Sequence, residues 1–375
     1  MWRNKQWHLI WLVPAVCLVG VPAVRADNTL RKELAVVADG LAKAVKAFGH
    51  DAIAVGEFTG PPQLPTSGGP VIAQTLIEEL NKKGLTVKRV AAVGVKGEYR
   101  DVKDKETGLL AAQIKGTVTD RTGKVLFTFS RGVFGDALLA SLFGTTTPLP
   151  PGHDVRDRSR DLETSLDQPG VHVAGTRVST SATSPFAVEI LVAPYAGAAL
   201  KARAAKVEDG LAFVSIKRGE VYGVRLINKS DYEAAATLTI DGLNMYAFST
   251  MRDPKTGQPR HSQVIVDPHG SVVIKGWHLT DEVSQEFLVT EYARSAAFEL
   301  GSTAKVGTIT VSFAACWPDG ARPPADEPAD PRSHSRSADA TGRGSQFKEK
   351  YVEVKRNFGV IRDVISVRYT KDSAN

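Results

Sequence analysis

The stretch that most constrains the fold lies at residues 219–248, where three short runs of alternating apolar residues follow one another. Apolar side chains fall on every second position at 222–226, at 236–240 and at 243–247. Asp241 and Gly242 separate the second run from the third, and an Asp-Gly pair between alternating runs is a strong signal of a β-hairpin. The sequence therefore predicts antiparallel sheet in this half of the chain.

Similar runs continue to the end of the chain. They occupy 186–192, 211–216, 263–266, 272–277, 306–313 and 360–369. Many short strands joined by polar turns indicate a β-sandwich of immunoglobulin-like or jelly-roll type, which we expect to span residues 186–375. We also expect one helix at 291–300, and a disordered insertion at about 318–345 because Pro, Asp, Arg and Ser dominate that segment.

The first half shows a different order of elements. Apolar residues spaced by three and four predict one helix over 30–48 and another from Pro70 to Lys83. Strands are predicted at 51–58, 109–119 and 124–130. This order indicates a small α/β domain at 27–144, and the weakly periodic residues 145–185 are predicted to be a linker. The expected fold class is α+β, a small α/β domain followed by an all-β sandwich.

Segments in both halves of the chain resemble known proteins. IAVGEFTG at 53–60 and SGGPVIAQTLIEELNKKGLTVKR at 67–89 resemble the start of the domain shared by the curli-secretion lipoprotein, the flagellar FlgO protein and the amino-terminal part of TolB. This resemblance covers about residues 50–95 and implies an envelope protein that works by assembly or binding. TLTIDGLNMYAFS, IKGWH and IRDVISVRY resemble uncharacterised exported proteins of planctomycete-type bacteria, and no activity is implied.

The first 26 residues are typical of a cleaved signal peptide. Arg3 and Lys5 precede an apolar run at 9–21, and Val24 and Ala26 suit a small-residue cleavage site. We therefore expect export to the periplasm or the extracellular space, with Cys17 as the less favoured site of lipid anchoring. The net charge is +6 and three positive charges lie in this segment, so the remaining +3 argues against nucleic-acid binding. No integral membrane segment is expected after cleavage.

Candidate site residues are few. Trp277, Tyr246 and Phe248 could form an aromatic patch that binds a ligand, although a sandwich core also needs aromatic residues. Three histidines, His261, His269 and His278, fall near the ends of predicted strands and could in principle hold zinc. Their spacings match no zinc motif, so surface turns are the favoured interpretation.

Cys316 and the pair His153 and Asp154 have side chains that could take part in catalysis. Cys316 is more simply explained as a buried apolar residue than as a nucleophile. His153 and Asp154 fall in the predicted linker, where catalytic geometry would be hard to maintain. No catalytic residue and no cofactor is therefore predicted.

The favoured hypothesis is an exported, non-enzymatic binding or scaffolding protein of the bacterial cell envelope. Its partner would be an envelope protein or a polysaccharide. One alternative is a metal-dependent hydrolase acting on envelope polymers, with the three histidines as its site. A second alternative is a structural adhesion module whose free sheet edge recruits partner strands.

Overall fold

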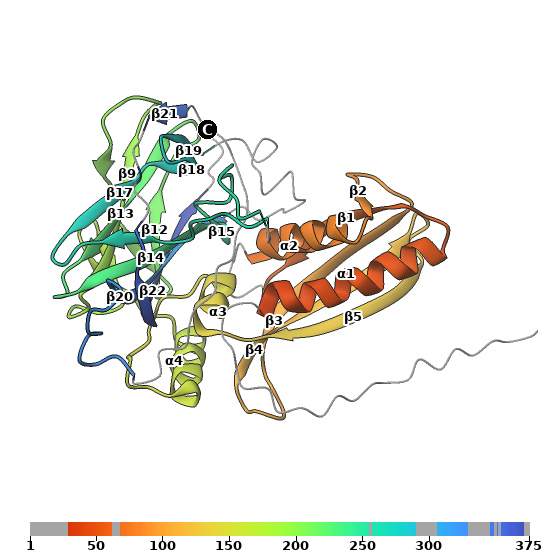
Figure 1. Cartoon of the computed structure of the whole chain (residues 1–375), viewed down its shortest axis with the longest axis horizontal. Coiled ribbons are helices and arrows are strands. Elements are labelled where there is room, and N and C mark those ends of the chain that lie inside the picture. The colour runs from red at the N-terminus through yellow and green to blue at the C-terminus, as the bar shows by residue number, and fades with distance from the viewer. Residues whose placement is uncertain are drawn as a thin grey trace, which may run out of the picture.

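The computed structural model describes residues 29–61, 68–254, 257–289, 306–328, 346–348, 351 and 354–370. These residues form an α/β body and a β-sandwich that lie side by side (Figure 1). The predicted α+β class with a sandwich is confirmed. The expected signal peptide and the expected helix at 291–300 lie outside the described residues.

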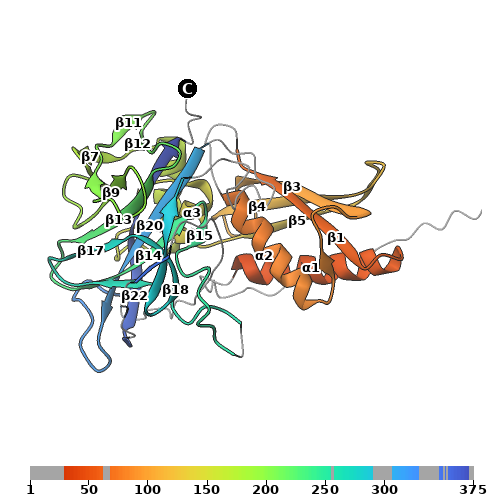
Figure 2. The ribbon, with the colours of Figure 1, turned by 90° about the horizontal axis from the view of Figure 1, so that it is seen from above.

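The α/β body is built on one five-stranded sheet, of order β2-β1-β3-β4-β5. Strand β1 is parallel to β2 and β3, whereas β3, β4 and β5 are antiparallel. Two long helices cover one face of this sheet and leave the other face open (Figure 2). The elements are α1 (Thr29–Ala47), β1 (Ala52–Thr59), α2 (Gly68–Lys82), β2 (Thr86–Val87), β3 (Val93–Lys103), β4 (Leu110–Asp120) and β5 (Val125–Val133).

A row of residues across this sheet shows how it packs. Gly97 and Gly116 are paired in register on β3 and β4, and Phe129 follows Gly116 on β5. A Cβ atom on Gly116 would lie 2.2 Å from the Phe129 ring, and one on Gly97 would lie 2.6 Å from the Phe58 ring. The two glycines therefore make room for two aromatic rings beneath the helices.

The predicted linker at 145–185 is wrong, because this segment is ordered and packed. It holds β6 (Thr147–Pro148), α4 (Val155–Asp167), β7 (His172–Ala174) and β8 (Arg177–Ser179), after α3 (Asp136–Phe143). Leu149, Leu162 and Leu166 belong to the same core as α1 and α2, and this core reaches Val364 in the sandwich. Helix α4 has only two buried leucines in a strongly charged sequence, so its apolar spacing was easily missed.

The sandwich consists of two sheets. The nine-stranded sheet runs β18-β19-β13-β9-β8-β7, with β10, β17 and β21 attached to β9, β13 and β19. Besides β7 and β8, its strands are β9 (Phe186–Ala193), β10 (Lys201–Ala202), β13 (Val221–Asn228), β17 (Ser271–Ile274), β18 (Gly276–Thr280), β19 (Val283–Leu288) and β21 (Gln346–Lys348).

The eight-stranded sheet runs β11-β12-β22-β20-β14-β15, with β16 paired to β14 and β6 paired to β22. Its remaining strands are β11 (Lys206–Glu208), β12 (Leu211–Ser215), β14 (Glu233–Ile240), β15 (Leu243–Asn244), β16 (Val264–Val266), β20 (Val306–Trp317) and β22 (Asn357–Thr370). The predicted hairpin is confirmed here. Asp241 and Gly242 both have positive φ, 52° and 81°, as a two-residue turn between β14 and β15 requires.

The α/β body docks on the outer face of this sheet through α3. The Arg368 guanidinium is buried in the junction and donates from Nη2 to the carbonyl of Gly144, 3.0 Å away, at the end of α3. The Ser366 hydroxyl donates to the Thr145 carbonyl at 3.0 Å. These bonds satisfy carbonyl groups that the helix end would otherwise bury without partners.

The predicted disordered insertion at 318–345 is wrong for its first part, because residues 318–328 are described and pack against β22. Arg362 is 6% exposed and donates to Asp326 and to Glu327, each at 2.9 Å from Nη2. Its guanidinium also lies 4.6 Å from the centre of the Tyr232 ring. Residues 329–345 lie outside the described part of the chain.

Candidate functional site

A cleft of about 910 Å³ lies between the α/β body and the sandwich. Helices α1, α2 and α3 form one wall, and the outer face of the eight-stranded sheet forms the other. The first wall is lined by Leu30, Arg31, Val71, Thr75, Leu138 and Ser141. Ser141 and Thr239 hydroxyls lie 3.3 Å apart and link the two walls at one point.

Hydroxyl groups line the sheet side of the cleft. Thr237 and Thr239 on β14, and Thr310 and Ser312 on β20, face outward, because the residues between them, such as Leu238, fill the sandwich core. The alternation of the β14 sequence therefore produces both the core and a polar surface. This surface can donate and accept hydrogen bonds without carrying charge.

Charged residues of the cleft balance one another. Its basic lining residues, Arg31, Arg260, Lys355 and Arg356, equal in number its acidic ones, Glu233, Asp267, Asp281 and Asp319. Two of the arginines are engaged in ion pairs. Arg356 Nη2 lies 3.0 Å from Glu233, and Arg31 lies 2.7 Å from Glu79 on α2. The charges of the lining thus nearly cancel, and apolar side chains such as Val71, Val272 and Ile274 lie among the polar ones.

Two of the three predicted histidines meet at the side of this cleft. The ring centres of His261 and His278 are 5.8 Å apart. Both Nε2 atoms face Asp281 Oδ1, at 3.5 Å from His261 and 3.2 Å from His278. Tyr246 and Tyr351 pack against the His278 ring, with ring centres at 4.9 and 4.8 Å.

The environment of His278 favours the neutral imidazole. Its side chain is fully buried, and burial lowers its pKa, although the Asp281 carboxylate opposes this effect. Its Nδ1 atom has no hydrogen-bond partner among the described residues. His261 and Asp281 line the cleft itself, so a ligand would meet these two side chains and not His278.

Of the remaining predicted site residues, only Tyr246 lies at the cleft. His269 lies apart in an exposed turn and pairs with Asp231 at 2.9 Å. Trp277 and Tyr246 are each only 4% exposed, and Phe248 is half-buried against the Trp277 ring, at 5.3 Å between centres. Of the two interpretations of these aromatic residues, the structure therefore agrees with core packing, because Trp277 and Tyr246 belong to the sandwich core and Phe248 packs against it.

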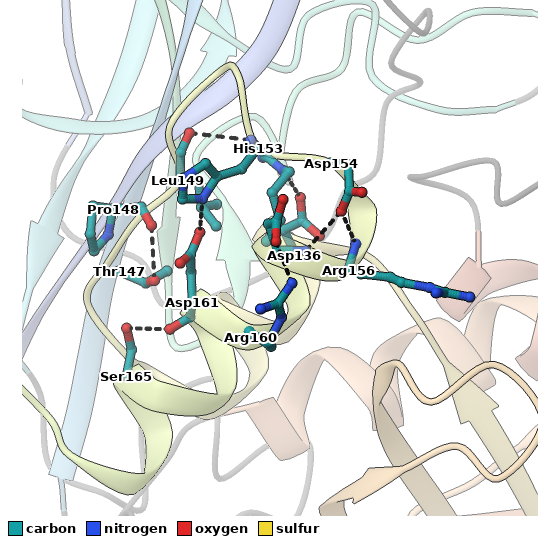
Figure 3. Close-up of polar contacts among 12 residues, drawn as sticks. Asp136, Thr147, Pro148, Leu149, His153, Asp154, Arg156, Arg160, Asp161 and Ser165 are labelled. Atoms are coloured by element: carbon teal, nitrogen blue, oxygen red, sulfur yellow. Dashed lines mark hydrogen bonds and ion pairs between the residues drawn. The ribbon is translucent and has the colours of Figure 1, made fainter.

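His153 and Asp154 have structural roles at the start of α4 (Figure 3). The Asp154 carboxylate accepts hydrogen bonds from the backbone N–H groups of Arg156 and Asp157, at 2.8 and 2.9 Å. These bonds hold the pKa of Asp154 below its usual value. His153 Nδ1 lies 2.7 Å from Asp161, which is eight residues further along the chain, in the second turn of α4. Asp154 therefore caps α4, and His153 links the start of this helix to its second turn.

Cys316 is 1% exposed on β20, and burial raises the pKa of its thiol to about 12. A nucleophilic cysteine needs a lowered pKa and access to substrate. The environment of Cys316 is that of a packed apolar side chain, as predicted.

The chain matches no family model, no curated protein and no solved structure in the comparisons made. Within the described residues, no three His, Cys, Asp or Glu side chains are placed to hold a metal ion. The described helices include none with the length and apolar character needed to cross a membrane.

Sequence reasoning missed Asp281 and the cleft. Asp281 follows His278 by three residues, which is a weak local signal that the two side chains could meet. His261 has no such signal, because its approach depends on how β15 and the following loop pack beside β18. The cleft is formed by residues from both halves of the chain and has no local signature.

Proposed function

We propose that the protein is an exported, non-enzymatic binding protein of the bacterial cell envelope, and that its ligand lies in the cleft between the α/β body and the sandwich. The observation that carries this proposal is the volume of about 910 Å³ enclosed by two separate walls. This volume falls within the range of small-molecule and oligomer binding sites. Export rests on the signal-like residues 1–26.

The chemistry of the lining supports an uncharged polar ligand. Threonine and serine hydroxyls lie on the sheet side beside apolar side chains, and Gln263 adds an amide group. Basic and acidic residues balance, so neither a polyanion nor a polycation is favoured. Among the polymers of a cell envelope, a segment of polysaccharide fits such a surface, because its hydroxyl groups both donate and accept hydrogen bonds.

The test is a binding titration with oligosaccharides released from the envelope by partial hydrolysis, added to the protein from Asp27 onward. Thr237→Arg places a long cation in the cleft, and we expect it to weaken binding by at least about tenfold. Thr117→Arg is the matched control, because Thr117 is also a half-buried threonine on a strand, and it lies on β4 in the sheet of the α/β body, outside the cleft. Saturable binding that Thr237→Arg leaves unchanged would contradict the proposed site, and an absence of binding would contradict the ligand class.

A hydrolase acting on envelope polymers is the second candidate. The observation that favours it is the approach of His261 to Asp281 in the lining of the cleft. Such a pair could exchange a proton with a bound substrate. The measurement is release of reducing ends from the same oligosaccharides. Turnover lost in His261→Gln and kept in the control His269→Gln would establish the enzyme, and binding without turnover would favour the binding protein.

A further inference from the structure

The outer edge of the α/β sheet is a long strand whose free side pairs with no other described strand. Strand β5 pairs with β4 along one side, and no described strand pairs with its other side. Figure 1 shows β5 at the margin of the α/β body, with α1 above it. An edge strand presents a row of backbone N–H and C=O groups that can pair with another strand.

Strand β5 has few of the usual protections of an edge strand, namely one bulge near its start and one charged residue, Arg131. Its sequence, VLFTFSRGV, contains no proline and no lysine. Its register with β4 shifts once, near the start of β5, between the pairs Val118–Phe127 and Thr119–Val125. Val125 is 54% exposed, and Phe127 and Phe129 are half-buried on the side that α1 covers. Natural proteins normally blunt such an edge with charges, bulges or a covering segment.

The side of α1 above this edge is also uncovered. Glu33 marks that side, because its carboxylate lies 4.0 Å from Arg131 of β5. Val36, Gly40 and Ala44 follow at helical spacing, and Val36 is 49% exposed. A Cβ atom added to Gly40 would meet nothing within 4 Å, so no contact among the described residues explains a glycine in the middle of the helix. Glycine at such a position is unfavourable relative to alanine, because it loses more backbone freedom on folding.

We propose that β5 pairs antiparallel with β5 of a second copy of this chain, so that two sheets join into one and the two α1 helices pack beside each other. A two-fold axis perpendicular to the sheet brings identical edges together and keeps both helical layers on the same side. The polar residues Thr128 and Ser130 then remain on the open face.

The charges on this side of the molecule suit a copy of itself. Arg131 of β5 pairs with Glu33 of α1 at 4.0 Å, and Lys43 of α1 pairs with Asp39 at 2.6 Å. Because these charges are paired within each copy, two-fold apposition meets little like-charge repulsion. Gly40 allows the close approach of two helix backbones, which a larger residue would prevent.

The experiment measures the mass of the protein from Asp27 onward by light scattering during gel filtration. A dimer at about 100 µM is the expected result. The double variant Val36→Arg/Gly40→Arg adds like charge and bulk to open space beside α1, and we expect its dissociation constant to rise at least tenfold. Because arginine is a better helix former than glycine, the melting temperature of the Gly40→Arg single variant should not fall.

The control is Asn81→Arg, on the exposed side of α2, which should leave the dimer unchanged. A second variant, Thr128→Lys/Ser130→Lys, places like charges across the seam on the open face and should also give monomers. A wild-type protein that is monomeric at about 100 µM would overturn the proposal that β5 pairs with a second copy of the chain. A dimer that persists in both variants would overturn it as well.

Discussion

The carboxyl group of Asp363 on β22 is buried. Replacing it with an amide tests how much the ionisation of this group destabilises the folded protein. The residue is 5% exposed and accepts hydrogen bonds from the hydroxyls of Ser184 and Thr180, the latter at 2.9 Å. Burial raises the pKa of Asp363 from 3.8 to about 6, even though both hydrogen bonds act to lower it. No cation is among the causes of the shift.

The sign of the pH dependence follows from this shift. Between pH 3.8 and about pH 6 the folded protein binds more protons at Asp363 than the unfolded chain does. The free energy of unfolding therefore falls as the pH rises through this window. The difference between the two pKa values corresponds to about 3 kcal/mol, which is the largest contribution that ionisation of Asp363 can remove.

Asp363→Asn should remove this contribution. Above pH 7 the variant should be more stable than the wild type by about 1–2 kcal/mol, because an amide accepts weaker hydrogen bonds than a carboxylate and so recovers only part of the 3 kcal/mol. Near pH 4 the two proteins should be similar, since Asp363 is then protonated. The assay is urea unfolding followed by circular dichroism at several values of pH, with the variant compared to the wild type at each.

A matched variant checks the cause. Ser184→Ala removes one hydrogen bond that lowers the pKa of Asp363, so the pH window should move upward. If the stability difference between Asp363→Asn and the wild type were the same at pH 4 and pH 8, the burial argument would be wrong.

Three further predictions concern packing, a buried ion pair and a helix cap. Gly116→Val should destabilise the α/β body by about 1–3 kcal/mol in urea unfolding, because its side chain must displace the Phe129 ring. Arg362→Met should cost about 3–5 kcal/mol by the same assay, since it leaves the fully buried Glu327 carboxylate without its cation, and adding Glu327→Gln should recover part of the loss. Asp154→Ala should cost about 1 kcal/mol and lower the melting temperature, because the first turn of α4 loses its cap.

Elements with a strong local signal were predictable. Helix α1 was expected at 30–48 and lies at Thr29–Ala47, because its apolar stripe faces the sheet along its whole length. The turn at Asp241 and Gly242 was also predictable, since positive φ at two successive positions is tolerated by few residue pairs. The hydroxyl-bearing face of β14 follows from the same alternation that buries Leu238.

Elements that depend on distant contacts were not predictable. Helix α4 shows little apolar periodicity, and it is stabilised by a cap at Asp154 and by burial of Leu162 and Leu166 against elements far away in the sequence. The sequence around Trp277 does not reveal whether its side chain is buried or exposed, because a tryptophan suits both a core and a binding surface. Only the packing of the two sheets of the sandwich places it in the core.

The sequence by itself determined the alternation of the strands, the amphipathic helices and the signal-like start, because each depends on neighbours within a few residues. The tertiary structure alone decided that His261 reaches Asp281, that residues 145–185 join one core, and that a cleft lies between the two bodies. Each of these needs segments far apart in the chain to come together. A local pattern carries no information on which distant surface it will meet, since many surfaces could bury the same side chains.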